Sequence, residues 1–85
     1  MPYEIWITVW RLPKERQTRR ARWTCTIERV DGNVNEVIAV KSSRNRYFAK
    51  RFGSSYLRTG ASLPVTWKRI SSNLLIGHAV MRKLV

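Results

Sequence analysis

The 85-residue sequence predicts one α+β domain over residues 1–85, in which a small antiparallel three-stranded sheet packs with one or two helices. Three observations favour this class. Two β-prone stretches near the N-terminus alternate apolar and polar residues, an Asp-Gly pair separates the second stretch from a third, and the apolar spacing then changes to a helical period. The expected order is β-β-β-α-(β)-α, where the brackets mark a possible short fourth strand.

The first strand is expected at residues 3–11. Its alternation gives an odd face with Tyr3, Ile5, Ile7 and Val9 and an even face with Glu4, Trp6, Thr8 and Trp10. Pro13 ends the strand, because proline has no N–H to donate to a neighbouring strand. Residues 14–22 are polar and rich in arginine, so we expect an exposed basic connection there.

A β-hairpin is expected next. Residues 22–30 alternate again, with Trp23, Cys25 and Ile27 on one face. Asp31-Gly32 follows, and this pair favours a type I′ turn, which needs positive φ at both central positions. Residues 34–41 form the return strand.

A helix is expected over residues 42–58. Ser42 and Ser43 offer an N-cap, and a helical spacing typical of a buried face relates Phe48, Phe52 and Tyr56. Gly53 favours an early end of this helix, because glycine inside a helix costs about 1 kcal/mol relative to alanine.

The remaining residues predict a loop at 59–64, a short strand at 65–70 and a terminal helix over 74–85. The helix is favoured because Ile76, Val80 and Leu84 recur at helical spacing. Gly77 weakens a helix, so a buried strand stays as the alternative for this segment.

The charge balance is strongly basic, with 17 Lys and Arg residues against 5 Asp and Glu residues and a formal net charge of +12. Every acidic residue lies within the first 36 positions. Because so much like charge opposes compaction, a polyanion is the expected partner, and nucleic acid is the commonest one. A ribosome-type structural protein and a binder of acidic membrane surfaces stay as alternatives. A disordered tail does not fit, because 44% of the residues are hydrophobic and four are tryptophan.

Two basic segments are the expected nucleic-acid-binding sites. The connection at 14–22 offers cations for phosphate contacts, at Lys14, Arg16, Arg19, Arg20 and Arg22. In the predicted helix, Arg44, Arg51 and Arg58 recur every seven residues without acidic neighbours for internal salt bridges. The second set comprises Lys41, Arg44, Arg46, Lys50, Arg51, Arg58, Lys68 and Arg69. A solvated surface is the alternative for both segments.

The even face of the first strand has two interpretations. In the first, Trp6 and Trp10 lie on an open face with Thr24 and Thr26, and this face inserts into a groove of nucleic acid or stacks on unpaired bases. Alternatively, the terminal helix covers this face and the tryptophans belong to the core.

The sequence is poor in catalytic and metal-binding residues. The one histidine, His78, lies in an apolar stretch, and five scattered carboxylates do not suit a two-metal nuclease. Cys25 is the only cysteine, so we expect neither an intrachain disulfide nor a cysteine-based zinc site, and the composition fits a reducing compartment. We therefore expect no catalytic residue, no metal and no cofactor.

The favoured function is non-enzymatic binding of DNA or RNA through phosphate contacts. Two alternatives stay open. One is a small accessory or inhibitory protein that docks on a nucleoprotein complex, and the other is a metal-independent ribonuclease toxin whose cations stabilise the transition state. The sequence has neither an apolar run of about 18 residues nor a signal peptide, so we expect no membrane partner. The expected location is cytoplasmic, with a nucleoid-associated or nuclear location as the alternative. The oligomeric state is left open.

Overall fold

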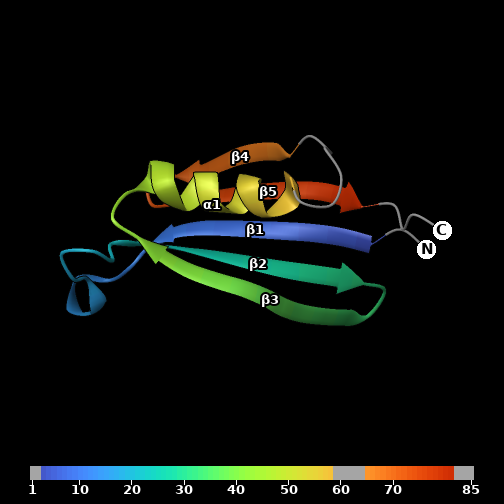
Figure 1. Cartoon of the computed structure of the whole chain (residues 1–85), viewed down its shortest axis with the longest axis horizontal. Helices are drawn as coiled ribbons and strands as arrows, with labels where there is room; N and C mark the ends of the chain where they lie inside the picture. The colour runs from blue at the N-terminus through green and yellow to red at the C-terminus, as the bar shows by residue number, and fades with distance from the viewer. Residues whose placement is uncertain (1–2, 59–64, 82–85) are drawn as a thin grey trace.

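A computed structural model of the chain describes residues 3–58 and 65–81 (Figure 1). Its elements are β1 (Tyr3–Arg11), a 3-10 turn (Lys14–Arg16), β2 (Trp23–Asp31), β3 (Val34–Ser43), α1 (Arg46–Arg58), β4 (Thr66–Ser71) and β5 (Leu74–Met81). The strands form one antiparallel sheet in the order β3-β2-β1-β5-β4. The α+β class, the hairpin, the helix and the short fourth strand are confirmed. The predicted loop at 59–64 lies outside the described residues.

The predicted terminal helix is wrong, because residues 74–81 form strand β5. The sheet therefore has five strands instead of three, and α1 is the one α-helix in the described ranges. β5 lies between β1 and β4, so neighbours on both edges satisfy its backbone. Its side chains are apolar on both faces except for His78: Leu75 and Ala79 are buried beside Gly77 on one face, while Leu74 and Ile76 are half-buried with His78 on the other. Such a strand lacks the polar–apolar alternation that the prediction required.

The core lies between the sheet and α1, which contacts β1, β2 and β3 on one face of the sheet (Figure 1). The odd face of β1 points to the helix, and the largest fully buried side chains are Ile7, Ile27, Val9 and Cys25. Gly53 lies within α1 and does not end it, which corrects the predicted early end. A Cβ at this position would lie 2.7 Å from Cγ2 of Ile7, so the helix sits this close because residue 53 is glycine.

The helix begins after Asn45 instead of the predicted serine pair. The Phe48 backbone N–H donates a hydrogen bond to Oδ1 of Asn45 at 2.9 Å, which makes Asn45 the N-cap. Ser42 and Ser43 belong to β3, where their partners are in β2. The chain thus stays extended for two residues longer than the sequence predicts.

The later start changes which aromatic residues face the sheet. Phe52 packs against the core as predicted, but Phe48 is 49% exposed and does not. The buried helix position next to it is Ala49. The side chain of Tyr56 lies outside the described residues.

The predicted type I′ turn between β2 and β3 is wrong in its details. Asp31 pairs with Val34, which leaves Gly32 and Asn33 as the two turn residues. Gly32 has φ of +61°, and no non-glycine residue in the described ranges has positive φ. Positive φ at the first central residue alone is the pattern of a type II′ turn, which favours glycine there.

The face of the sheet opposite α1 carries no helix among the described residues. The alternative in which a terminal helix covers the tryptophans is therefore wrong, because residues 74–81 form β5. Trp10 is half-buried and pairs with Thr24, whose side chain is only 5% exposed. Trp6 is half-buried as well, with its ring centroid 4.3 Å from that of His78 on β5. Trp6 and Trp10 thus lie, both half-buried, on this face of the sheet, which we call the helix-free face.

Candidate functional site

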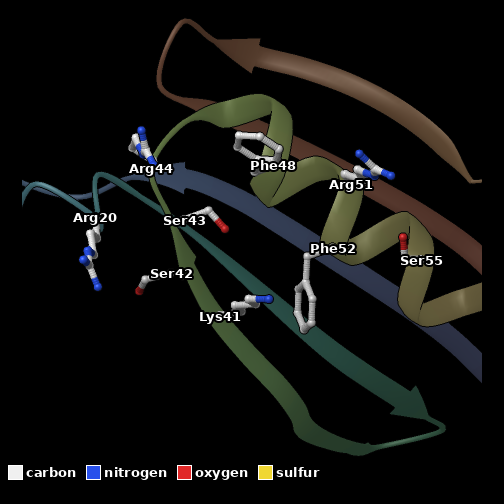
Figure 2. A pocket seen from close by; sticks show the side chains of 9 residues that line it. All are labelled: Arg20, Lys41, Ser42, Ser43, Arg44, Phe48, Arg51, Phe52 and Ser55. Atoms are coloured by element: carbon white, nitrogen blue, oxygen red, sulfur yellow. The ribbon is translucent and has the colours of Figure 1, made fainter.

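Cationic side chains from three segments gather in one open groove beside α1 (Figure 2). The groove has a volume of about 530 Å³ and lies between α1, the end of β3 and the connection before β2. We call it the basic groove, and its lining is Arg20, Lys41, Ser42, Ser43, Arg44, Phe48, Arg51, Phe52 and Ser55. The lining thus combines four cations, three serines and two aromatic rings, and the Ser42 hydroxyl lies 3.2 Å from that of Thr24.

The junction between β3 and α1 builds most of this groove. β3 ends at Ser43, the chain bends at Arg44, and Asn45 caps the helix. Residues three or four apart on a helix share one side. One side of α1 therefore presents Phe48, Arg51, Phe52 and Ser55 to the groove (Figure 2).

Arg20 reaches the groove from a turn in the connection between β1 and β2. Reciprocal backbone hydrogen bonds join Thr18 and Ala21 at 3.0 and 3.4 Å, and the Arg20 N–H donates to Oγ1 of Thr18 at 3.3 Å. The Gln17 side chain also donates to the carbonyl of Leu12 at 2.7 Å. The predicted exposed connection is therefore held by hydrogen bonds, which place one of its cations at the groove.

No carboxylate balances the cations of the basic groove. Within residues 3–58 and 65–81, the ion pairs join Arg29 to Asp31 at 3.5 Å and His78 to Glu4 at 3.1 Å, and neither pair lines the groove. The Lys41 ammonium instead lies 5.3 Å from the ring centroid of Phe52, in a cation–π contact. The groove thus carries uncompensated positive charge, which attracts anions.

A second group of cations lies on the other side of α1, in a depression of about 420 Å³ lined by Asn45, Arg46, Tyr47, Lys50, Arg69 and Leu75. The Lys50 ammonium lies 5.1 Å from the ring centroid of Trp67 on β4. A third depression, over α1 itself, shares Arg51 with the basic groove and Lys50 with the second depression. The cationic surface is therefore continuous from β3 across α1 to β4, and we call it the basic band.

Seven of the thirteen predicted cations line the basic band: Arg20, Lys41, Arg44, Arg46, Lys50, Arg51 and Arg69. Four others lie in the connection before β2 and line no part of it: Lys14, Arg16, Arg19 and Arg22. Lys68 pairs with Ile76 on the helix-free face, away from the band. The side chain of Arg58 lies outside the described residues.

The predicted arginine stripe on the helix is wrong as a stripe. Arg44 precedes α1, so it does not lie one seven-residue repeat before Arg51 on a helical surface. The two side chains nevertheless line the same groove, because the bend at residue 44 turns the chain from β3 into α1.

Five groove residues were not expected in the site: Ser42, Ser43, Phe48, Phe52 and Ser55. Asn45 is the residue that would have indicated both Ser42 and Ser43 and also Phe48, because asparagine ranks with serine as an N-cap. A helix capped at Asn45 leaves both serines in the strand and moves Phe48 out of the buried stripe.

The cysteine and the histidine of the chain, residue types that often take part in catalysis or metal binding, lie outside the basic band. Burial raises the pKa of the Cys25 thiol from 9.0 to about 11, more than a backbone hydrogen bond from Gly53 lowers it, so the thiol is neutral at pH 7. His78 lies 3.1 Å from Glu4 on the helix-free face. Within the described ranges, no group of three or more His, Cys, Asp or Glu residues could hold a metal ion, and no helix is long and apolar enough to cross a membrane.

Comparisons of the chain with protein-family models, with curated proteins and with solved structures give no match.

Proposed function

We propose that this protein binds nucleic acid through the basic band and catalyses no reaction. The observation that carries the proposal is the composition of the basic groove, in which four cations and no carboxylate surround one open cavity. Arginine guanidinium groups match phosphate oxygens bidentately, and serine hydroxyls donate to the same oxygens. The groove therefore has the donors that a phosphate backbone requires.

A polyanion fits this surface better than a single small anion. The cations of the band lie on both sides of α1, from Lys41 on β3 to Arg69 on β4, so one phosphate cannot contact them all. A chain of phosphates can, and the counterions that it releases favour binding. Phe48 is 49% exposed beside the cations and offers a ring on which a sugar or base can pack.

The start of α1 adds to the attraction for phosphate. Its first turn holds no acidic residue, so the partial positive charge of the helix N-terminus is not neutralised locally. The band begins at this end of the helix, with Arg44 on one side and Arg46 on the other. The dipole and the side chains thus act on the same anion.

The ribonuclease alternative gains no support from these positions. The basic groove is lined by one lysine and three arginines and by no histidine or carboxylate, the side chains that most often act as general bases. His78 lies on the helix-free face, and Cys25 is buried beneath α1. Binding without chemistry therefore accounts for the groove more simply.

The proposal is tested by titrating labelled DNA and RNA, in duplex and single-stranded form, with nuclease-treated protein at several salt concentrations. Each neutralised phosphate contributes about −0.9 to the slope of log K against log salt for duplex DNA, so contacts from the four groove cations give a slope of roughly −3 to −4. A slope near zero, or no binding at low salt, contradicts the proposal. If a partner from cells instead stays bound after nuclease treatment, the accessory-protein alternative is supported.

A further inference from the structure

Strand β3 is an edge of the sheet and is open to another chain. It pairs with β2 on one side and with none of the described residues on the other (Figure 1). Its ten residues, Val34–Ser43, hold one acidic and one basic side chain, so its net charge is zero in a chain of +12. The exposed fractions of its valines are 66% for Val34, 57% for Val37 and 60% for Val40. A long, neutral and apolar edge is the kind that pairs with another strand.

The other edge strand, β4, is protected against such pairing. It has six residues, and Lys68 and Arg69 stand next to each other within it. A second copy of β4 placed along it would bring like charges together, which is unfavourable across a strand pair. The β3 edge can therefore pair with a second copy of itself, whereas like charges oppose such pairing at the β4 edge.

A β-bulge in the middle of β3 determines which side chains share a face. Ala39 pairs with Ile27 and Val37 pairs with Glu28, so Ile38 is the extra residue. The extra residue reverses the alternation of side chains between the two faces of the sheet. Two residues on either side of the bulge and three positions apart, such as Val37 and Val40, therefore point to the same face.

The faces follow from the partners in β2. Val37 and Val40 pair with Glu28 and Thr26, which lie on the helix-free face with Trp6 and Thr8 of β1. Glu36 and Lys41 pair with Arg29 and Cys25, which lie on the face that carries α1, as do their β1 partners Ile5 and Val9. The strand thus presents one valine pair and one pair of opposite charges, each placed symmetrically about residues 38 and 39.

We propose that two copies of this protein pair through β3 in antiparallel register, with the two-fold axis between Ile38 and Ala39. Val37 of each copy then stands opposite Val40 of the other on the helix-free face. Glu36 of each copy stands opposite Lys41 of the other on the helix face. Because the axis is two-fold, each favourable pair occurs twice.

This register satisfies both the side chains and the backbone. Cross-strand pairs of β-branched residues and of opposite charges stabilise antiparallel strands. The unpaired N–H and C=O groups of the edge gain partners as well. Without the bulge, the same register would place each valine opposite a residue of the other face, so the bulge is what makes β3 self-complementary.

The dimer would hold two basic grooves on one surface. A two-fold axis perpendicular to the joined sheets leaves both copies of α1 on the same side. Glu36 of the other copy is paired with Lys41 there, so a single polyanion meets Arg20, Arg44 and Arg51 of both grooves. This consequence rests on the proposed function, whereas the pairing itself does not.

The oligomeric state of nucleic-acid-free protein tests the pairing, measured by analytical ultracentrifugation over a range of concentrations. We expect a dimer for the natural chain and a rise of roughly tenfold or more in the dimer dissociation constant for Val37→Lys, because both valine pairs are lost and like charge is added. Ile70→Lys is the matched control, since it adds the same charge at an exposed residue of β4, and it should leave the dimer intact. A monomeric natural chain, or a Val37→Lys dimer as tight as the natural one, overturns the proposal.

A charge exchange tests the register. Glu36→Lys and Lys41→Glu should each weaken the dimer, because each places like charges opposite one another twice. The double variant restores opposite charges and the natural net charge, so it should dimerise as the natural chain does. Circular dichroism confirms that each variant is folded. A double variant that dissociates as readily as the single variants shows that the register is wrong and overturns the proposal.

Discussion

Residue 53 sets the distance between α1 and the sheet. Glycine is a poor helix former, yet here it lies in the middle of a 13-residue helix and over the centre of the core. Its missing Cβ leaves room for the Ile7 side chain of β1 and for the Cys25 sulfur of β2. The cost in helix propensity is therefore offset by closer packing at the point where the helix contacts both strands.

Gly53→Ala should lower the free energy of unfolding. Alanine gains about 1 kcal/mol of helix propensity, but overpacking a tight core costs about 1–3 kcal/mol. The overpacking cost should win, because the new Cβ would lie 2.7 Å from Cγ2 of Ile7, a fully buried and rotamer-restricted side chain. Denaturant unfolding checks this, with Ser55→Ala at an exposed position of the same helix as the control. If Gly53→Ala unfolds at higher denaturant than the natural chain, the close approach is not limiting.

A Trp10 variant tests which face of the sheet contacts nucleic acid. It is half-buried beside Thr24 on the helix-free face, whereas the basic band is on the other face. Trp10→Ala should therefore lower stability by about 1–3 kcal/mol, less than the ~3–5 kcal/mol of a full core truncation. Its affinity for nucleic acid, measured below the melting temperature, should stay that of the natural chain. Weaker binding with unchanged melting would instead assign the contact to the helix-free face.

At the scale of elements, the sequence predicts best where local patterns alone decide the structure. β1 alternates strictly, and its predicted bounds are the observed ones. The β2–β3 hairpin follows from an alternating run before Asp31-Gly32 and a second strand-forming run after it. The start of α1 was missed because Ser42, Ser43 and Asn45 are all good caps, and only pairing with β2 draws both serines into the strand.

β5 shows what local patterns cannot provide. It pairs with β1, the most distant strand in the sequence, with Tyr3 opposite Met81 and Trp10 opposite Leu74. This neighbour on one edge and β4 on the other make an unalternating apolar run stable as a strand. Gly77 fits the same explanation, because a Cβ there would lie 2.9 Å from the ring of Trp67 on β4. The residue that argues against a helix is thus a site of close packing between two strands.

The hairpin turn provides a prediction at this scale. Gly32 has φ of +61°, and a Cβ at this position would meet no atom within 4 Å, so the cost of a side chain there is backbone strain alone. Gly32→Val should destabilise the domain by roughly 1–3 kcal/mol, because a β-branched residue rarely adopts positive φ. Gly32→Asn should cost less, since asparagine tolerates this region. Equal melting temperatures for the two variants would contradict the strain argument.

At the scale of the whole molecule, the fold turns an uneven charge distribution along the chain into an uneven surface. Acidic residues stop at Glu36, and the groove takes all its residues except Arg20 from positions 41–55. The sequence therefore identified the cations that form the band but not how they group. Their grouping depends on the bend at Arg44 and on the turn that brings Arg20 across to β3, and both are tertiary features.

The central claim is that the arrangement of cations, and not net charge alone, binds nucleic acid. Two variants with the same change in charge test it. The groove variant, Arg44→Ala with Arg51→Ala, removes two of the four cations of the basic groove. The control variant, Lys14→Ala with Lys68→Ala, removes two exposed cations outside the groove. All four lack acidic partners among the described residues, so both double variants should melt close to the natural chain.

The decisive measurement is the salt dependence of duplex binding for these two variants beside the natural chain. We expect the groove variant to bind more weakly at every salt concentration, with a slope shallower by roughly 0.9 for each lost phosphate contact. The control variant should keep nearly the natural affinity and slope. Equal weakening of both variants would contradict the account, because net charge would then explain the binding, and so would a groove variant that binds as tightly as the natural chain.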